Sequence, residues 1–387
     1  MPISTCRVCG QDFYDEPLLV YKNMPRSAQY LLTDDEMSTD KGIDLEVCQC
    51  SGCGLIQLSN DPVSYYREVI RASSVSEEMR SFRYTQFSEF IEKYDLKGKK
   101  IVEIGCGKGE YMDIMRKCDI DVHGIEHADS SVSYCQSKGL QVIRDFIDID
   151  NQSIQNGPFD SFISFSYLEH MPDPNSVMRG IYNNLVSGAV GLVEVPNFDM
   201  ILRHELFSEF ISDHLLYFTK DTLDTLIRLN GFEVVDIQEI WHNYILSCTI
   251  KKRAECKLSF LKLYGQRITI EIDNFIRKWR AKGKTIASWG AGHQALMVLS
   301  LLELSDCIEY VVDSAAFKQD RFTPVTHLPI VSPDKLDAEP VDIVIVMAAS
   351  YSDEVARIIR DRFSEKIFVA VLRDFGLEVI GDPHPRL

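Results

Sequence analysis

The spacing of apolar residues changes sharply near residue 100. From about residue 74 to residue 94, apolar and aromatic side chains recur three and four positions apart, which predicts an amphipathic helix. The segment that follows, "KGKKIVEIGCGKGEYMDIM", begins with a short apolar run over Ile101–Ile104 and then becomes rich in glycine. A short apolar run bounded by glycine predicts a buried strand, a turn and a second helix.

Apolar runs of strand length then alternate with helical patterns as far as residue 252. The runs are "IDVHGIEHAD", "VIRDFID", "FDSFISFS", "GAVGLVEVPN", "FEVVDIQEIW" and "YILSCTIKK". The last two are joined by a short connection and predict a hairpin. This order indicates an α/β domain over residues 74–252, with a doubly wound, Rossmann-like sheet that carries one antiparallel edge.

The C-terminal third repeats the pattern on a smaller scale. Residues 253–282 have the periodicity of one long amphipathic helix, which we expect to bridge two domains. Strand, glycine turn and helix follow in "GKTIASWGAGHQALMVLSLLE", with further strands in "IEYVVD", "VDIVIVMAAS" and "KIFVAVL". Residues 283–387 are therefore predicted to form a second Rossmann-like domain. Its Gly290, Gly292 and Asp313 imitate a dinucleotide fingerprint, so an NAD-dependent role stays open.

Two pairs of cysteines lie near the N-terminus, in "CRVCG" and "CSGCG". Two such C-x-x-C knuckles are typical of a tetrahedral structural zinc site with four thiolates and no open position. We expect the module to span residues 1–73, with Cys48 buried or outside the ligand set. The predicted zinc ligands are Cys6, Cys9, Cys50 and Cys53.

The chain carries 41 Lys and Arg against 58 Asp and Glu, a formal net charge of -17. This balance argues against a nucleic-acid partner, which requires clustered basic residues. No apolar run reaches the roughly 18 residues of a membrane span, and the first residues do not resemble a signal peptide. We expect a cytoplasmic protein with no membrane partner and with thiols rather than disulfides. Its oligomeric state, monomer or dimer, is left open.

The glycine turn after the first strand is a candidate cofactor site. Gly105, Gly107 and Gly109 let backbone amides approach a ligand closely. Glu126, at the tip of the next strand, suits the two ribose hydroxyls of an adenosine. Asp145 and Phe146 are placed to meet an adenine edge and face. The turn alone is a weak signal, because several cofactors use it.

The edge hairpin, together with Glu103 before the glycines, resembles the class I S-adenosylmethionine-dependent methyltransferases. Four phrases, "VEVPNFD", "DHLLYFTKDTL", "SWGAGHQA" and "YVVDSAAFKQDRFTPVTHLPIVSP", extend the likeness over essentially the whole chain. Together they resemble the nucleotide-sugar C-methyltransferases of deoxysugar biosynthesis. The resemblance implies S-adenosylmethionine as cofactor and a nucleotide-diphosphate sugar as substrate. It also implies a C-terminal domain that helps to hold this substrate and does not use NAD.

The resemblance places the catalytic residues in "SEFISDHLLYFT". Relatives typically carry tyrosine, histidine, glutamate and histidine where this chain has Ile211, Ser212, Asp213 and His214. His214 is then the base that removes a proton beside a sugar ketone, and Asp213 tunes its surroundings. The resemblance adds His170 and His242, and it adds Tyr65 or Tyr66. Either Tyr66 or His170 is expected to donate to the developing enolate.

Several alternatives stay open on the sequence. In an O-methyltransferase the same histidine would deprotonate a hydroxyl. Loss of the tyrosine and first histidine before Asp213 would also suit a non-catalytic binding protein on the same scaffold. His214 could instead be a satisfied core histidine. Lys318 and Arg321 could face a phosphate, although such charges are usually solvated.

Overall fold

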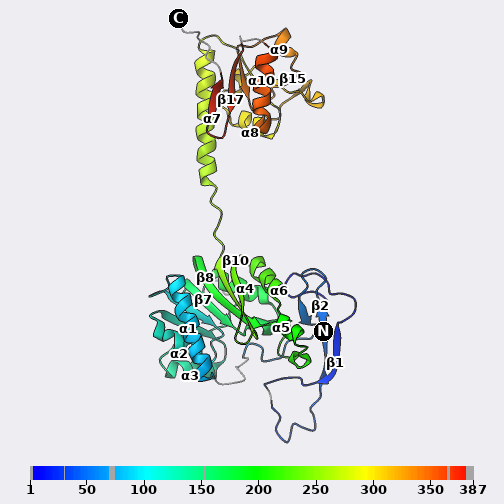
Figure 1. Ribbon diagram of the computed structural model, residues 1–387, viewed down its shortest axis with the longest axis vertical. Helices are drawn as coiled ribbons and strands as arrows, with labels where there is room; N and C mark the ends of the chain where they lie inside the picture. Colours follow the sequence, from blue (N-terminus) through cyan, green and yellow to red (C-terminus); the bar gives the residue numbers. More distant parts are fainter. Residues whose placement is uncertain (1–2, 30, 69–74, 151–152, 364–366, 381–387) are drawn as a thin grey trace. The chain divides into compact units, whose positions relative to one another are not determined.

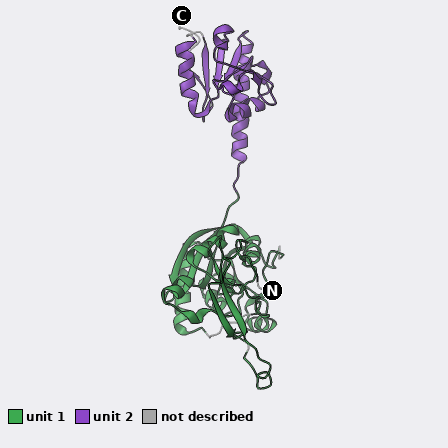
Figure 2. Ribbon diagram, turned by 90° about the vertical axis from the view of Figure 1, so that its right-hand side faces the viewer, with its two compact units in different colours: residues 1–255 green, residues 256–387 purple. Residues whose placement is uncertain are grey.

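The computed structural model describes residues 3–29, 31–68, 75–150, 153–363 and 367–380. The chain divides into two compact units, Met1–Glu255 and Cys256–Leu387 (Figure 2). The predicted first residue of the helix before the glycine turn, Ser74, lies outside the described residues. The N-terminal cysteine module and the predicted methyltransferase domain therefore form one unit.

The first unit contains eleven of the strands and six of the α-helices described. The strands are β1 (Leu19–Met24), β2 (Ile43–Gln49), β3 (Ile56–Leu58), β4 (Lys100–Ile104), β5 (Asp121–Glu126), β6 (Gln141–Arg144), β7 (Phe159–Phe165), β8 (Leu185–Pro196), β9 (Leu216–Tyr217), β10 (Phe232–Ile240) and β11 (Ile245–Lys252). The helices are α1 (Glu77–Lys93), α2 (Glu110–Met115), α3 (Asp129–Ser137), α4 (Pro174–Asn183), α5 (Phe198–Arg203) and α6 (Lys220–Leu229).

The main sheet of this unit has the strand order β10-β11-β8-β7-β4-β5-β6. All neighbouring strands are parallel except β11, which is antiparallel to both β8 and β10. The prediction of a doubly wound sheet is confirmed, and the antiparallel strand lies next to the edge strand β10. Helices α1, α2 and α3 cover one face and α4 and α6 the other (Figure 1), because apolar side chains alternate along the strands into two separate cores.

A smaller antiparallel sheet, β1-β2-β3-β9, joins distant parts of the chain. Strand β9 follows α5 in sequence, yet Ile56 of β3 pairs with Tyr217 of β9. A shared core that includes Leu45, Phe198 and Tyr217 lies beneath this sheet. The pairing holds the segment around His214 against the N-terminal module.

The second unit is a separate seven-stranded sheet with the order β14-β15-β13-β12-β16-β17-β18. Its strands are β12 (Ile286–Trp289), β13 (Val311–Val312), β14 (Arg321–Phe322), β15 (Pro329–Val331), β16 (Ile343–Val346), β17 (Phe368–Leu372) and β18 (Leu377–Ile380). The central strands are parallel and both edge pairs are antiparallel. Its helices are α7 (Ser259–Arg280), α8 (His293–Leu301), α9 (Lys335–Ala338) and α10 (Ser352–Arg362).

The predicted bridging helix begins later than expected, at Ser259. Ile272, Ile276 and Trp279 of α7 are buried in the core of the second unit, so the helix is part of that unit. The prediction of a long amphipathic helix was therefore correct. The periodicity alone does not show which core the apolar face of that helix contacts. Within the described residues, a helix with both the length and the apolarity needed to cross a membrane is absent.

Candidate active site

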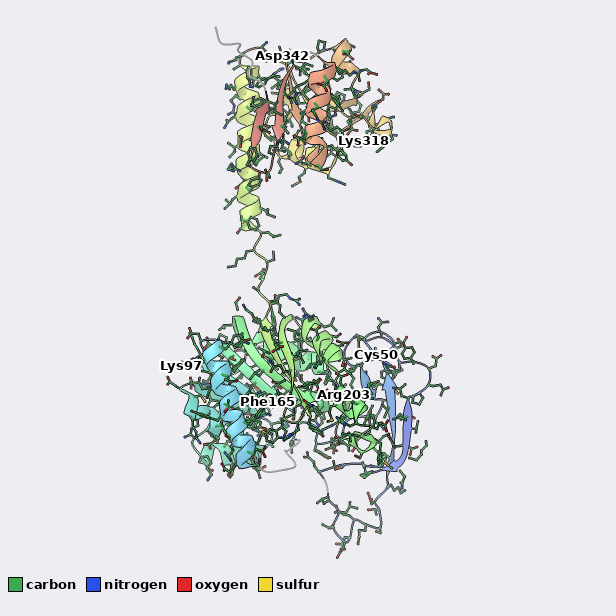
Figure 3. All side chains as sticks on the ribbon, viewed as in Figure 1. Cys50, Lys97, Phe165, Arg203, Lys318 and Asp342 are labelled. Atoms are coloured by element: carbon green, nitrogen blue, oxygen red, sulfur yellow. The ribbon has the colours of Figure 1, made fainter. Side chains whose placement is uncertain are left out.

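The four cysteines of the two knuckles converge on one point. The Sγ atoms of Cys6 and Cys53 are 3.7 Å apart, and those of Cys9 and Cys50 are 3.3 Å apart. Four thiolates bound at about 2.3 Å around a tetrahedral zinc ion lie about 3.8 Å from one another, so the cluster fits zinc. Backbone N–H groups and the buried Gln57 amide donate to these sulfurs, as expected for thiolates. Cys50 is labelled in Figure 3.

Cys48 is buried and lies outside this cluster, as the sequence predicted. The closed set of four sulfurs leaves no position for a substrate. The chemistry of the donor set therefore suits a structural ion that would hold the two knuckles together.

The glycine turn opens directly from β4, beside the tip of β5. Gly107 has a φ of 56°, and a side chain added there would meet open space, which leaves its backbone accessible to a ligand. The carboxylate of Glu126 accepts hydrogen bonds from the Gly107 N–H at 2.8 Å and the Ala128 N–H at 2.9 Å. These bonds fix one carboxylate at the mouth of the turn, where it can receive ribose hydroxyls.

The other cofactor candidates lie around the same turn. Glu103 is buried in β4, immediately before the glycines. The Asp145 N–H donates to the backbone carbonyl of Glu126 at 3.1 Å. This hydrogen bond holds Phe146, the next residue, near the end of β5. The guanidinium of Arg67 covers one face of Phe146 at 4.5 Å from the ring centroid. A cavity of about 100 Å³ adjoins Phe146, lined also by Met171 and Val177.

The loop after β7 connects the glycine turn to the predicted catalytic residues. Phe165, labelled in Figure 3, is the last residue of β7. Tyr167 then packs against the turn so tightly that a Cβ on Gly105 would lie 2.4 Å from its ring. A short 3-10 helix, Leu168–His170, follows directly. The loop thus runs from Tyr167, which contacts the glycine turn, to Glu169 and His170 two and three residues later.

His170 and His214 form an imidazole pair at this place. Their ring centroids are 4.8 Å apart with the planes at 70°. The Nδ1 atom of His170 is 2.7 Å from the backbone oxygen of Asp213. Because a carbonyl can only accept, the hydrogen of a neutral His170 resides on Nδ1 and its Nε2 is left as an acceptor. Leu215 N–H donates to the Glu169 carbonyl, which ties the two segments together.

Glu169 is the third member of the cluster and was not selected from the sequence. Its carboxyl oxygen lies 3.9 Å from His170 Nε2, and one polar atom from each of Glu169, His170 and His214 falls within a 4.8 Å span. The signal was present as a carboxylate inside the apolar stretch "SYLEHM", directly after a buried strand. Carboxylates in such surroundings are typical of functional sites.

Burial controls the charges of all three groups. It lowers the pKa of His214 to about 3, with a smaller contribution from His170, and it also lowers the pKa of His170. Burial raises the pKa of Glu169 to about 8. At neutral pH the cluster therefore holds two neutral imidazoles and a protonated carboxyl group.

Asp213 has a structural arrangement that the sequence did not reveal. Its carboxylate accepts from the Ala28 N–H at 2.8 Å and from the Tyr65 hydroxyl at 2.8 Å, so it anchors the N-terminal module. The hydroxyl of Tyr65 also meets Ser27 at 2.7 Å. Asp213 thus reaches the imidazole pair through its backbone carbonyl and not through its carboxylate.

Tyr66 and His242 contact aromatic residues outside the imidazole pair. Tyr65 rather than Tyr66 meets Asp213, and the Tyr66 ring packs edge-on against Phe146 at 6.2 Å. His242 is exposed in the turn between β10 and β11, where its ring contacts Trp241 at 5.2 Å. The hairpin thus carries a histidine near its tip, as the sequence suggested, but outside the cluster around Glu169.

A buried ion pair between α1 and β8 also went unpredicted. Arg83 meets Glu194 at 2.6 Å, and both side chains are about 1–2% exposed. Gln86 and Ser247 donate to the same carboxylate. The ion pair fixes α1 to β8, the strand that precedes the segment around His214.

The dinucleotide-like fingerprint of the second unit is internally satisfied. Asp313 accepts from the N–H groups of Ala291 and Ala315, and Lys318 pairs with it at 2.9 Å. The carboxylate that would hold an NAD ribose is engaged by a lysine, and Arg321 lies exposed on the edge strand β14. A separate cavity of about 460 Å³ lies between α7 and α8.

Comparisons with known proteins agree with this arrangement. Residues 76–237 match the family model described as a methyltransferase domain, and residues 259–369 match the C-methyltransferase C-terminal domain. These two matches, together with the sheet order, identify an S-adenosylmethionine-dependent methyltransferase.

Similar proteins of known name indicate the kind of methyltransferase. The C-methyltransferase NovU of Streptomyces niveus is 24% identical over 421 aligned residues, which cover 100% of this chain and 97% of NovU. The chain belongs to the S-adenosylmethionine-dependent methyltransferases and is similar over its whole length to a C-methyltransferase. A ubiquinone biosynthesis O-methyltransferase of Pseudomonas entomophila is 30% identical over 172 residues, 39% of this chain and 72% of that protein. The solved structure of an S-adenosylmethionine-dependent methyltransferase from Clostridium acetobutylicum aligns with 49% of this chain. The alignment includes 96% of that protein, at 12% identity and a TM-score of 0.38.

Proposed function

We propose that the protein methylates the carbon next to the keto group of a nucleotide-linked sugar, with His214 as the base. The observation that carries this proposal is the pair of neutral imidazoles at the exit of β7, next to the glycine turn. The family's C-terminal domain, matched by residues 259–369, supports carbon as the acceptor. The sugar itself follows from the resemblance of the whole sequence.

Methylation of a sugar carbon requires a base that removes a proton from that carbon. The cofactor itself needs no activation. The sulfonium methyl is already electrophilic, whereas a sugar carbon becomes nucleophilic only after loss of a proton beside a ketone. His214 is neutral at physiological pH because burial lowers its pKa, so it can accept that proton directly. The enolate carbon then attacks the methyl, which leaves with its bond to sulfur broken.

We propose zinc as the structural ion of the N-terminal knuckles. The four sulfurs fit a closed tetrahedral site, and the β3–β9 pairing links this module to the segment that carries His214. The ion would hold the two knuckles and so keep Tyr65 and Ala28 against Asp213. Its contribution would be to folding and not to methyl transfer.

A mass-spectrometric screen tests the proposed function. Purified protein and S-adenosylmethionine are incubated with nucleoside-diphosphate sugars, with and without a 4-keto group, and the new methyl is located by fragmentation. We expect a mass gain of one methyl on a carbon, with keto-sugars only. Methylation of a hydroxyl would indicate an O-methyltransferase, and the absence of transfer to any keto-sugar would contradict the proposed substrate class.

A further inference from the structure

The carboxyl group of Glu169 is buried without a hydrogen-bonding partner. Its side chain is 1% exposed, and neither carboxyl oxygen has a hydrogen-bond partner among the described residues. A lone ionised carboxylate in such a place is strongly disfavoured, so the group keeps its proton instead. Burial raises the pKa of Glu169 to about 8, in agreement with this geometry. Glu169 therefore offers one O–H donor inside the cluster.

The neighbouring groups cannot offer such a donor. His170 commits its Nδ1 hydrogen to the carbonyl of Asp213, which leaves Nε2 as an acceptor on the side of Glu169. His214 must present a lone pair in order to act as the base. The hydroxyl of Tyr65 is used by the Asp213 carboxylate. His170 therefore presents no hydrogen at Nε2, and the Tyr66 ring packs against Phe146.

We propose that Glu169, in its protonated form, is a catalytic donor to the keto oxygen of the substrate. Its O–H would donate to the oxygen on which negative charge develops while His214 takes the proton from the adjacent carbon. This inference rests on the proposed function, since it needs a ketone in the cluster. A donor positioned before the reaction stabilises the developing charge without the cost of reorganising solvent.

The step balances in atoms and charge. The C–H bond breaks, its proton goes to His214, and its electron pair forms the carbon–carbon double bond of the enolate. The carbonyl oxygen gains charge and takes the hydrogen bond, or the proton, of Glu169. When the carbon attacks the sulfonium methyl, the methyl–sulfur bond breaks, the carbonyl re-forms and the proton returns to Glu169. S-adenosylhomocysteine leaves as the neutral product, and His214 releases its proton to solvent.

The coupling also explains how a histidine with a strongly lowered pKa can act as a base. An imidazolium at His214 is disfavoured by burial, so proton transfer to it alone would be uphill. As the proton of Glu169 moves toward the substrate oxygen, the carboxyl group becomes more negative within the same cluster. The positive and negative charges then appear together and stabilise each other.

A divalent cation is the other occupant that two histidines and a carboxylate could hold. The 3.9 Å between Glu169 and His170 ligand atoms is wider than the roughly 3.3 Å expected between nitrogen and oxygen ligands of a tetrahedral ion at about 2.0–2.1 Å. An organic oxygen that accepts the single O–H of Glu169 does not require the ligand atoms to approach so closely. The cation is therefore an outcome that the experiment must distinguish.

The experiment compares Glu169→Gln, Glu169→Met and the exposed control Glu92→Gln in the full-length protein with S-adenosylmethionine. The probe is a nucleoside-diphosphate-linked 4-keto sugar. Glutamine keeps an N–H donor, so we expect turnover to fall about tenfold, whereas methionine should lower it by about 10²–10³, the usual loss for one donor to an oxyanion. Glu92→Gln should match the wild type. Equal losses in Glu169→Gln and Glu169→Met would overturn the donor role.

The pH profile separates a catalytic donor from a structural residue. Turnover of the wild type should fall above about pH 8, as Glu169 loses its proton, and this alkaline fall should be absent in Glu169→Gln. The other groups that face Glu169 do not titrate there: the pKa values of His170 and His214 are lowered by burial, and that of Tyr244 is raised mainly by burial. The Asp213 carboxylate is held by Tyr65. An unchanged alkaline limb in Glu169→Gln would contradict the proposal.

Infrared spectroscopy tests the protonation without any substrate. The wild-type complex with S-adenosylhomocysteine should show a protonated-carboxyl band at pH 6.5 that disappears by pH 9.5 and is missing in Glu169→Gln. If this band is present but no keto-sugar is methylated, the proposed function fails while the protonation stands. If the band is absent, or if turnover requires an added divalent cation whose binding is lost in Glu169→Gln, the donor proposal is overturned.

Discussion

The protonated state of Glu169 makes a quantitative prediction for the stability of the first unit. The pKa of this group is raised by burial from 4.5 in the unfolded chain to about 8 in the folded protein. Between these pH values the folded state binds one proton more than the unfolded state. The free energy of unfolding must therefore fall as pH rises through this window, by about 1.4 kcal/mol for each pH unit.

The two histidines act in the opposite direction at lower pH. The pKa of His214 is lowered by burial from 6.5 to about 3, so the unfolded chain binds the extra proton between those values and stability rises with pH. The pKa of His170 is lowered also. At pH 6.5 the histidines of the unfolded chain are still partly protonated, but both proteins share this contribution, so the comparison of the wild type with Glu169→Gln isolates Glu169. Between pH 6.5 and 8 the loss attributable to Glu169 is about 2 kcal/mol.

The assay is urea unfolding at pH 6.5 and pH 8, in wild type and Glu169→Gln. Both proteins carry Trp279→Phe and Trp289→Phe, so that fluorescence reports on Trp241 in the first unit alone. We expect the wild type to lose about 2 kcal/mol more than Glu169→Gln over this interval. Equal pH dependence in the two proteins would show that Glu169 is ionised at neutral pH, and the reasoning about the cluster would be refuted.

Three further predictions follow from other parts of the structure. Elemental analysis should find one zinc ion per chain, and Cys50→Ser should lose it and loosen the N-terminal module. Glu126→Ala should weaken S-adenosylmethionine binding in calorimetry by about 2 kcal/mol, roughly 30-fold, because the ribose loses its acceptor. Arg83→Met should destabilise the first unit by about 3–5 kcal/mol, since Glu194 is left buried and unpaired, and Glu194→Gln in the same chain should restore most of that loss.

The main sheet could be predicted because each of its strands is determined by residues that are close together in the sequence. Runs such as Ile101–Ile104 are apolar and short, and the glycine-rich segment that follows disfavours a continuous helix. The cluster of Cys6, Cys9, Cys50 and Cys53 was equally predictable, because the spacing within each C-x-x-C knuckle brings its two sulfurs together. In both cases residues close in sequence determine the structure.

The remaining features depend on contacts between distant residues. Tyr65, and not Tyr66, donates to Asp213. The two residues are 148 positions apart, so no pattern along the chain could predict this hydrogen bond. The position of His214 beside the N-terminal module depends on the β3–β9 pairing. Glu169 was overlooked because an acidic residue in a loop is usually solvated, and only the packed structure shows that this one is buried.

Exchange of the substrate proton with solvent tests the central claim most directly. The protein, loaded with S-adenosylhomocysteine so that no methyl can be transferred, is incubated in deuterated water with a nucleoside-diphosphate-linked 4-keto sugar. We predict deuterium uptake at the carbon next to the ketone by wild type and by the exposed control His204→Asn, with a rate about 10²–10⁴ lower in His214→Asn. Exchange at the wild-type rate in a folded His214→Asn protein would contradict the account and place the base elsewhere.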